Sequence, residues 1–229
     1  MKVERGELAQ LLQDAAAELN AAAVADENRD PFWQRRYGER GQRFMLSDGV
    51  HHFNYLAEAV RAGNPHVLEK YARWLRSVLV TRGMCSEHLA DGFRVRAAHI
   101  AARGWRHAWI ALDLLKCAAN SLTYTDPDAA GIVPGAGGPP LPALAGLARA
   151  HGLELADVEF DARHLLSYLS DALAFDRPSI LHDHLTWRGP FERQRGRPAA
   201  YLPDLLAALV PHLDGPPAEL LRAAAEAHA

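Results

Sequence analysis

The chain resembles itself, and this internal repeat limits its fold more than any other feature of the sequence. At an offset of 113 positions, residues 51–100 align without a gap with residues 164–213, and twelve of the fifty aligned positions are identical. Only about three or four identities are expected by chance for an average composition. The sequence therefore predicts a duplicated unit. The identical pairs are His51/His164, Tyr55/Tyr168, Leu56/Leu169, Ala59/Ala172, Pro65/Pro178, Leu68/Leu181, Trp74/Trp187, Arg82/Arg195, Gly83/Gly196, Leu89/Leu202, Asp91/Asp204 and His99/His212.

Apolar residues recur at helical spacing through both copies. Residues 44–62, for example, place Phe53, Leu56 and Val60 on one face of a helix. No stretch alternates between apolar and polar residues with period two and turn residues at its ends, which argues against a sheet. We predict an all-α fold, a duplicated helical bundle of two three- or four-helix repeats related by a pseudo-twofold axis, with an extra N-terminal helix.

The predicted boundaries follow from composition. Residues 126–141 are rich in Pro and Gly, which cannot propagate a helix, and we interpret them as a linker. An N-terminal helix over 1–29 and repeat 1 over 30–125 precede this linker, and repeat 2 over 142–229 follows it. Ser86 is a predicted N-cap within repeat 1.

Composition also limits the class of partner. The chain has 25 basic and 28 acidic residues and a net charge of −3, which argues against an electrostatic grip on nucleic acid. No apolar run reaches the roughly 18 residues that a membrane span needs, and residues 1–8 lack the apolar core of a secretion signal. Cys85 and Cys117 have no metal-site spacing, and we expect both to be reduced. The sequence thus predicts a cytoplasmic protein without membrane contact.

The polar residues shared by the two copies are the candidates for function. His51, Tyr55 and Glu58 lie at i, i+4 and i+7, on one stripe of a helix. The second copy repeats this stripe as His164, Tyr168 and Asp171. One interpretation is a hydrogen-bonded strut, in which the carboxylate fixes the tautomer of the imidazole. The other is that the copies face each other, so that the two histidines and two carboxylates converge as ligands of a divalent transition metal.

Further shared residues extend the predicted ligand-binding set. His99 and His212 form a mirrored pair near the carboxyl end of their helix, where the helix dipole favours an imidazolium. Trp74 and Trp187 could wall a cavity for a tetrapyrrole, and imidazole is an axial ligand of haem. The predicted cofactor-binding residues are His51, Tyr55, His164, Tyr168, His99, His212, Trp74 and Trp187.

Two local runs are specific to the second copy. Residues 181–184 (LHDH) resemble a tight His/Asp metal cluster, but the first copy has no counterpart, and we predict an exposed helical turn. Residues 188–197 combine several arginines with one glutamate and Phe191, which could meet a phosphate or an acidic partner. The interpretation that we favour for this run is a solvated, flexible loop that replaces the end of a helix.

A family resemblance covers about fifty residues of the first copy. The run His52–Pro65, followed by Tyr71–Leu75 and Arg82–Gly83, resembles the helical bundle of bacterial B12-binding regulators and photoreceptors. Trp74 and Glu87–His88 resemble the Trp and Glu-His signature of that family, at a longer spacing. In that family an α/β domain that carries the cobalamin follows the bundle, and this sequence has no such domain. The resemblance implies a bundle that serves sensing or partner binding.

Three functional hypotheses follow from these observations. The first is a non-enzymatic sensory or regulatory module that binds a small ligand, such as haem or another tetrapyrrole, between the two repeats. The second is a metal-dependent oxidase or hydrolase that uses the mirrored His and carboxylate residues. The third is a protein-interaction bundle without a ligand, which forms a homodimer through its N-terminal helix. We expect the first, with a small molecule or a protein as the partner.

Overall fold

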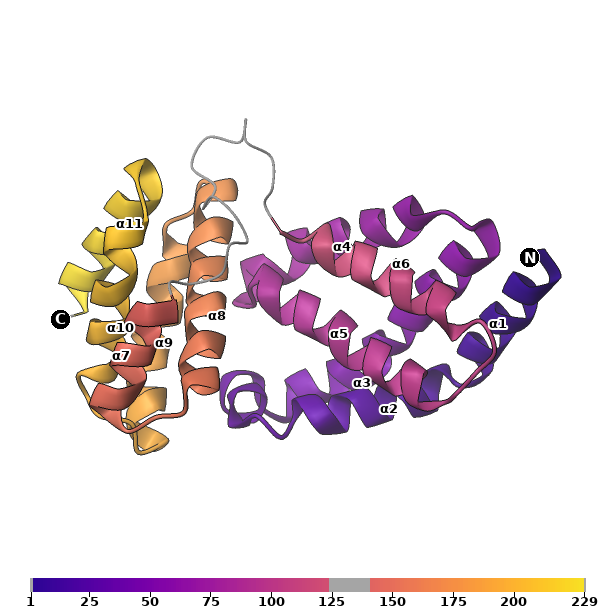
Figure 1. Ribbon diagram of the computed structural model, residues 1–229, viewed down its shortest axis with the longest axis horizontal. Coiled ribbons are helices and arrows are strands. Elements are labelled where there is room, and N and C mark those ends of the chain that lie inside the picture. The colour runs from indigo at the N-terminus through magenta and orange to yellow at the C-terminus, as the bar shows by residue number, and fades with distance from the viewer. Residues whose placement is uncertain (1, 124–140, 229) are drawn as a thin grey trace. The chain divides into compact units, whose positions relative to one another are not determined.

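The structure is a computed structural model that describes residues 2–123 and 141–228. Every regular element in these two ranges is a helix, which confirms the predicted all-α class (Figure 1). None of these helices is long and apolar enough to cross a membrane. The predicted linker at 126–141 lies outside the described residues, apart from Leu141, which begins a helix.

The chain divides into two compact units, which we describe separately. Unit 1 consists of Met1–Arg76 and His88–Leu122, and unit 2 consists of Ser77–Glu87 and Thr123–Ala229. The two predicted N-terminal segments, 1–29 and most of 30–125, thus belong to one unit, whereas the short segment 77–87 belongs with the second half of the chain.

Unit 1 is built around one long helix, α3 (Figure 1), which packs against α1, α2 and α6. The predicted N-terminal helix is two helices that meet at Ala15. Helical hydrogen bonds continue through this residue, from Ala15 N to Leu11 O at 3.0 Å and from Leu19 N to Ala15 O at 2.9 Å. The helices that contribute to unit 1 are α1 (Lys2–Asp14), α2 (Ala16–Glu27), α3 (Pro31–Ala62), α4 (Pro65–Leu79), α5 (Ser86–Ala102) and α6 (Ala108–Asn120).

The apolar pattern predicts a helix from residue 44, whereas α3 begins at Pro31. The Asp30 side chain accepts a hydrogen bond of 2.9 Å from the Phe32 backbone N–H, and Pro31 occupies the first helical turn. Both features favour a helix start. Gly38, with φ of 58°, kinks the helix, because this left-handed conformation is open mainly to glycine. The kink interrupts the helical periodicity of α3, so the apolar pattern predicts only the part of the helix that follows it.

A buried polar group joins α2, α3 and α5 within unit 1. The Asn20 amide nitrogen donates to the carbonyl oxygens of Met45 and Leu46, each at 3.0 Å, and the amide oxygen accepts from Arg96 Nη2 at 3.0 Å. Arg96 also pairs with Glu27 at 3.0 Å. The Asn20 side chain fits because Gly49 lies opposite it without a side chain. Hydrogen bonding of this kind fixes which turns of the helices face each other.

In unit 2, α8 packs against α7, α9 and α11 (Figure 1). Its apolar core includes Tyr168, Leu169 and Leu206, and Val80 and Cys85 from segment 77–87 are buried in the same cluster. The elements of unit 2 are η1 (Val80–Arg82), α7 (Leu141–His151), α8 (Leu155–Ala174), α9 (Ser179–Gln194), α10 (Tyr201–Leu209), η2 (Val210–His212) and α11 (Gly215–Ala227).

The two aligned halves share their turns as well as their residues. Gly63 and Asp176, which are 113 positions apart, both have positive φ, of 60° and 49°. Gly83 and Gly196, at the same offset, have φ of 92° and 76°. Few non-glycine residues adopt this conformation. The matched turns are what a duplicated unit would give, while the duplication itself stays a prediction.

Candidate functional site

The predicted site residues of unit 1 are mostly exposed. His51 and Glu58 lie on the solvent side of α3, and the Trp74 residue on α4 is 58% exposed. Tyr55 is also exposed, and its ring stacks on Tyr71 with centroids 4.0 Å apart. Trp74 lies beside this aromatic stack, with its ring centroid 6.0 Å from that of Tyr71.

Two histidines of unit 1 have polar partners in place of a ligand. His99 Nε2 lies 2.8 Å from Asp26 Oδ2, and His52 Nδ1 lies 2.9 Å from the Tyr71 hydroxyl. Burial, with a smaller contribution from the positive Arg96, holds the pKa of His52 well below its usual range. Burial also raises the pKa of the Tyr71 hydroxyl. The His52 ring is therefore neutral at pH 7 and belongs to the packing of α3 on α4.

In unit 2 the predicted stripe of α8 is buried and holds segment 77–87. The Tyr168 hydroxyl donates to the Gly83 carbonyl at 2.8 Å. Asp171 accepts from both the backbone N–H and the hydroxyl of Ser86, at 2.7 and 2.6 Å. Ser86 is therefore the first residue of α5 rather than its N-cap, and the carboxylate that satisfies the helix start comes from α8.

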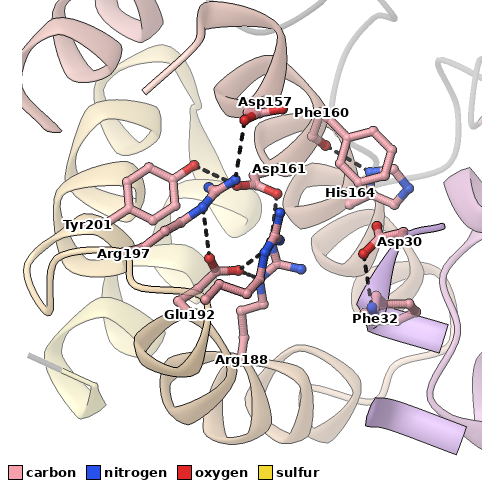
Figure 2. A network of polar contacts seen from close by, with 11 residues as sticks. Asp30, Phe32, Asp157, Phe160, Asp161, His164, Arg188, Glu192, Arg197 and Tyr201 are labelled. Carbon is pink, nitrogen blue, oxygen red and sulfur yellow. Dashed lines mark hydrogen bonds and ion pairs between the residues drawn. The ribbon is translucent and has the colours of Figure 1, made fainter. Parts of the chain in front are cut away.

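The stripe is a strut in part, but its tautomer is fixed differently from the prediction. The His164 Nδ1 lies 2.8 Å from the Phe160 carbonyl oxygen (Figure 2), and a carbonyl can only accept, so this nitrogen carries the proton. Asp171, the predicted partner, is bonded to Ser86 instead. Of the remaining predicted residues, Trp187 stacks on Phe191 at 4.6 Å and His212 is exposed.

The predicted metal set divides between the two units, with His51 and Glu58 in unit 1 and His164 and Asp171 in unit 2. Among residues 2–123 and 141–228, no group of three or more His, Cys, Asp or Glu side chains is arranged to hold a metal ion. Among the described residues, neither Cys85 nor Cys117 forms a disulfide.

The most concentrated polar group of unit 2 is a buried ion network that the sequence patterns did not reveal (Figure 2). Asp161 on α8 accepts from Arg188 Nη2 at 2.6 Å, from the Tyr201 hydroxyl at 2.6 Å and from Arg197. Glu192 pairs with Arg188 and with Arg197, whose Nε lies 3.1 Å from Glu192 Oε2. The network joins α8, α9 and α10. We call Asp161, Arg188, Glu192, Arg197 and Tyr201 the buried ion network.

The charges of this network balance. Two arginines and two carboxylates have side chains between 3% and 8% exposed, so each charge is satisfied by its neighbours rather than by water. Burial raises the pKa of the Glu192 carboxyl, although Arg188 opposes this effect. Burial alone would lower the pKa of Arg197, but Asp161 and Glu192 outweigh it and the net direction is upward. The network is therefore a structural brace that ties α8, α9 and α10 together.

The prediction of a solvated loop at residues 188–197 is thus wrong. Helix α9 continues to Gln194 although Pro190 lies inside it, so the helix has not lost its end. Arg188 and Glu192 are one helical turn apart and point into the unit, whereas Arg193 and Arg195 on the same run are exposed or partly exposed. The i, i+4 spacing of Arg188 and Glu192 was the one sequence signal that could have indicated this arrangement.

A cavity of about 290 Å³ lies beside the buried ion network in unit 2. Its apolar walls come from prolines and leucines of α9, α10 and the turn between them, and Glu192, Arg193, Thr186 and His228 supply polar groups. The full lining is Leu185, Thr186, Gly189, Pro190, Glu192, Arg193, Pro198, Ala199, Leu202, Pro203 and His228. This cavity contains none of the residues predicted as a site.

Three histidines of unit 2 that the repeat did not single out, His182, His184 and His228, also make ring contacts. His184 is buried and stacks on Tyr168 with centroids 3.7 Å apart, so the predicted exposed turn at 181–184 is wrong for this residue. His182 is exposed as predicted. Its Nδ1 lies 3.3 Å from Nε2 of His228, the residue that directly follows α11. Burial and the neighbouring His182 lower the pKa of His228.

Comparisons with known proteins give no relative. No protein-family model matches the chain, and neither the curated proteins nor the solved structures contain a significant match. The resemblance to B12-binding regulators therefore stays a prediction.

Proposed function

We propose that this protein is a regulatory helical module that binds a small organic anion in the cavity of unit 2. The observation that carries this proposal is the cavity of about 290 Å³ between α9, α10 and the end of α11. Ligand sites are typically concave and mostly apolar, with a few polar groups that orient the ligand. The lining of this cavity combines apolar side chains with polar groups that make up a similar share of its surface.

The charges around the cavity favour an anion. Glu192 is the only acidic residue in the lining, and Arg188 and Arg197 already neutralise it from the side of the core. The exposed Arg193 then leaves an excess of positive charge at the cavity, and the guanidinium geometry matches a carboxylate. Leu185, Leu202 and the prolines would contact the apolar body of the ligand.

The size of the cavity favours a compact molecule. Its volume lies at the lower end of the range of about 300–1,000 Å³ for ligand pockets. A small aromatic or branched aliphatic carboxylate fits this volume better than the tetrapyrrole that the sequence suggested. The buried ion network supports such a site, because it holds α8, α9 and α10 in fixed register before any ligand arrives.

The duplicated architecture remains part of this proposal. We infer that the two halves derive from one helical unit, which the matched residues and the matched left-handed turns support. The second copy carries the inward-pointing Arg188 and the cavity beside it. A functional division between the copies would follow, with ligand binding in unit 2.

Ligand binding can be tested by saturation-transfer NMR with a panel of small carboxylates, each paired with its uncharged amide, such as benzoate with benzamide. We expect the carboxylates to bind more tightly than the amides, and Arg193→Gln to remove this preference. Arg177→Gln is the matched control, because Arg177 is an exposed arginine of unit 2 that lies outside the cavity lining.

A second variant tests the location. Ala199→Trp places a large side chain in the cavity and should abolish the binding of both members of each pair. If no carboxylate of the panel binds, or if binding is the same in the Ala199→Trp variant, the proposed function is wrong.

A further inference from the structure

We infer that His182 and His228 form a binding site for one divalent transition-metal ion at the edge of unit 2, where α9 and the end of α11 meet. The site goes beyond the proposed function, because neither histidine needs an organic ligand in order to bind a metal. Copper, nickel and zinc are the ions that imidazole ligands favour.

The distance between the two ring nitrogens carries this inference. His228 Nε2 and His182 Nδ1 are 3.3 Å apart, with the ring planes at 43° to each other. In a tetrahedral zinc site with metal–nitrogen bonds of about 2.0–2.1 Å, two imidazole nitrogens lie about 3.3–3.4 Å apart. The same distance lies just beyond the range of about 2.7–3.2 Å that is usual for N–H···O hydrogen bonds. The two rings are thus spaced as ligands of one ion.

The fold brings these rings together from distant parts of the chain. The two residues are 46 positions apart in the sequence. His182 lies in the first turn of α9, and His228 is the C-cap residue of α11, which packs on α9. Both helices also pack on the core of unit 2, so the positions of the two rings are set by the fold rather than by an exposed loop.

Two protein ligands leave further coordination positions open. Because His228 also lines the cavity, an ion held here would lie at the cavity rim, and water or a donor atom from a bound molecule could complete its coordination. An open site of this kind suits reversible metal binding rather than a structural metal, which proteins usually enclose with four ligands.

The test uses the full chain without an affinity tag, freed of metal with EDTA and then dialysed. Titration with Zn²⁺, followed by calorimetry at pH 7.5, measures the number of ions bound, and Mg²⁺ serves as the control ion because it prefers oxygen ligands. We expect His182→Ala and His228→Ala each to bind one Zn²⁺ fewer than the wild-type chain. His212→Ala, which removes another exposed histidine of unit 2, should bind the same number as the wild type.

Cobalt provides a second readout, because tetrahedral Co²⁺ absorbs visible light. We expect an absorption band with the wild-type chain and with His212→Ala, and its loss in both site variants. His182 is exposed, so its replacement leaves the core intact, and circular dichroism checks that each variant is folded. A wild-type chain that binds no Zn²⁺, or a stoichiometry that is unchanged in His182→Ala and His228→Ala, would overturn the inference. Neither result depends on whether the cavity binds a carboxylate.

Discussion

Removing one charge from the buried ion network should destabilise unit 2 strongly. In Asp161→Asn the side chain keeps its shape, but Arg188 and Arg197 are left with Glu192 as the one remaining carboxylate of the network. The net charge of the network then changes from zero to +1. Breaking a buried ion pair by removing one partner costs about 3–5 kcal/mol. Because single domains are stable by only about 5–15 kcal/mol, this is a large part of the free energy of unfolding.

Asp157→Asn is a matched control, since it makes the same chemical change one helical turn earlier on α8. Asp157 is 57% exposed at its side chain and lies 4.0 Å from Arg197 Nη2. Exposed pairs of this kind contribute about 0–1 kcal/mol. We therefore expect a difference of about 2–5 kcal/mol between two Asp-to-Asn variants of the same helix.

Urea unfolding followed by circular dichroism measures the free energy, and hydrogen exchange with mass spectrometry assigns the change to α8, α9 and α10. The double variant Asp161→Asn/Arg197→Gln restores a neutral network, with Arg188 and Glu192 as the remaining pair. It should lose less stability than the sum of the single variants, with a coupling of about 1–3 kcal/mol. The reasoning is refuted if Asp161→Asn costs no more than Asp157→Asn, or if the single effects simply add.

Two further predictions concern unit 1. The folded state keeps the His52 ring neutral, whereas the unfolded chain takes up a proton on this ring below about pH 6.5. The free energy of unfolding should therefore decrease as the pH falls below about 6.5, by up to about 1.4 kcal/mol per pH unit, until the pH reaches the folded-state pKa of His52. Urea unfolding between pH 7.5 and 5.5 should show this pH dependence in the wild type and in His51→Gln. An equally steep pH dependence in His52→Gln would contradict the assignment to His52. In Gly49→Ala the new Cβ would lie 2.0 Å from Asn20 Oδ1, and we expect a loss of about 1–3 kcal/mol in thermal unfolding. Gly6→Ala, which meets no atom within 4 Å on α1, should instead gain up to about 1 kcal/mol, and equal effects of the two variants would argue against the proposed clash.

None of the cavity could be predicted from the repeat, but the burial of one predicted stripe could. Helical spacing correctly placed His164, Tyr168 and Asp171 on one face of α8, and that face is buried. The partners of Tyr168 and Asp171 could not be predicted, because they lie some 85 positions away in segment 77–87. The same residues in the first copy, such as His51, are exposed. Equivalence in sequence therefore did not imply equivalence in environment.

The amino-acid sequence by itself determined the helical class, because apolar periodicity acts over a few residues. Only the tertiary structure decided which charges are buried. Arg188 and Arg193 are chemically identical and five positions apart, yet one faces Asp161 in the core and the other faces solvent beside the cavity. An ion pair depends on the distance between charges in space, and residues 161, 188 and 197 come together only when α8 and α9 pack.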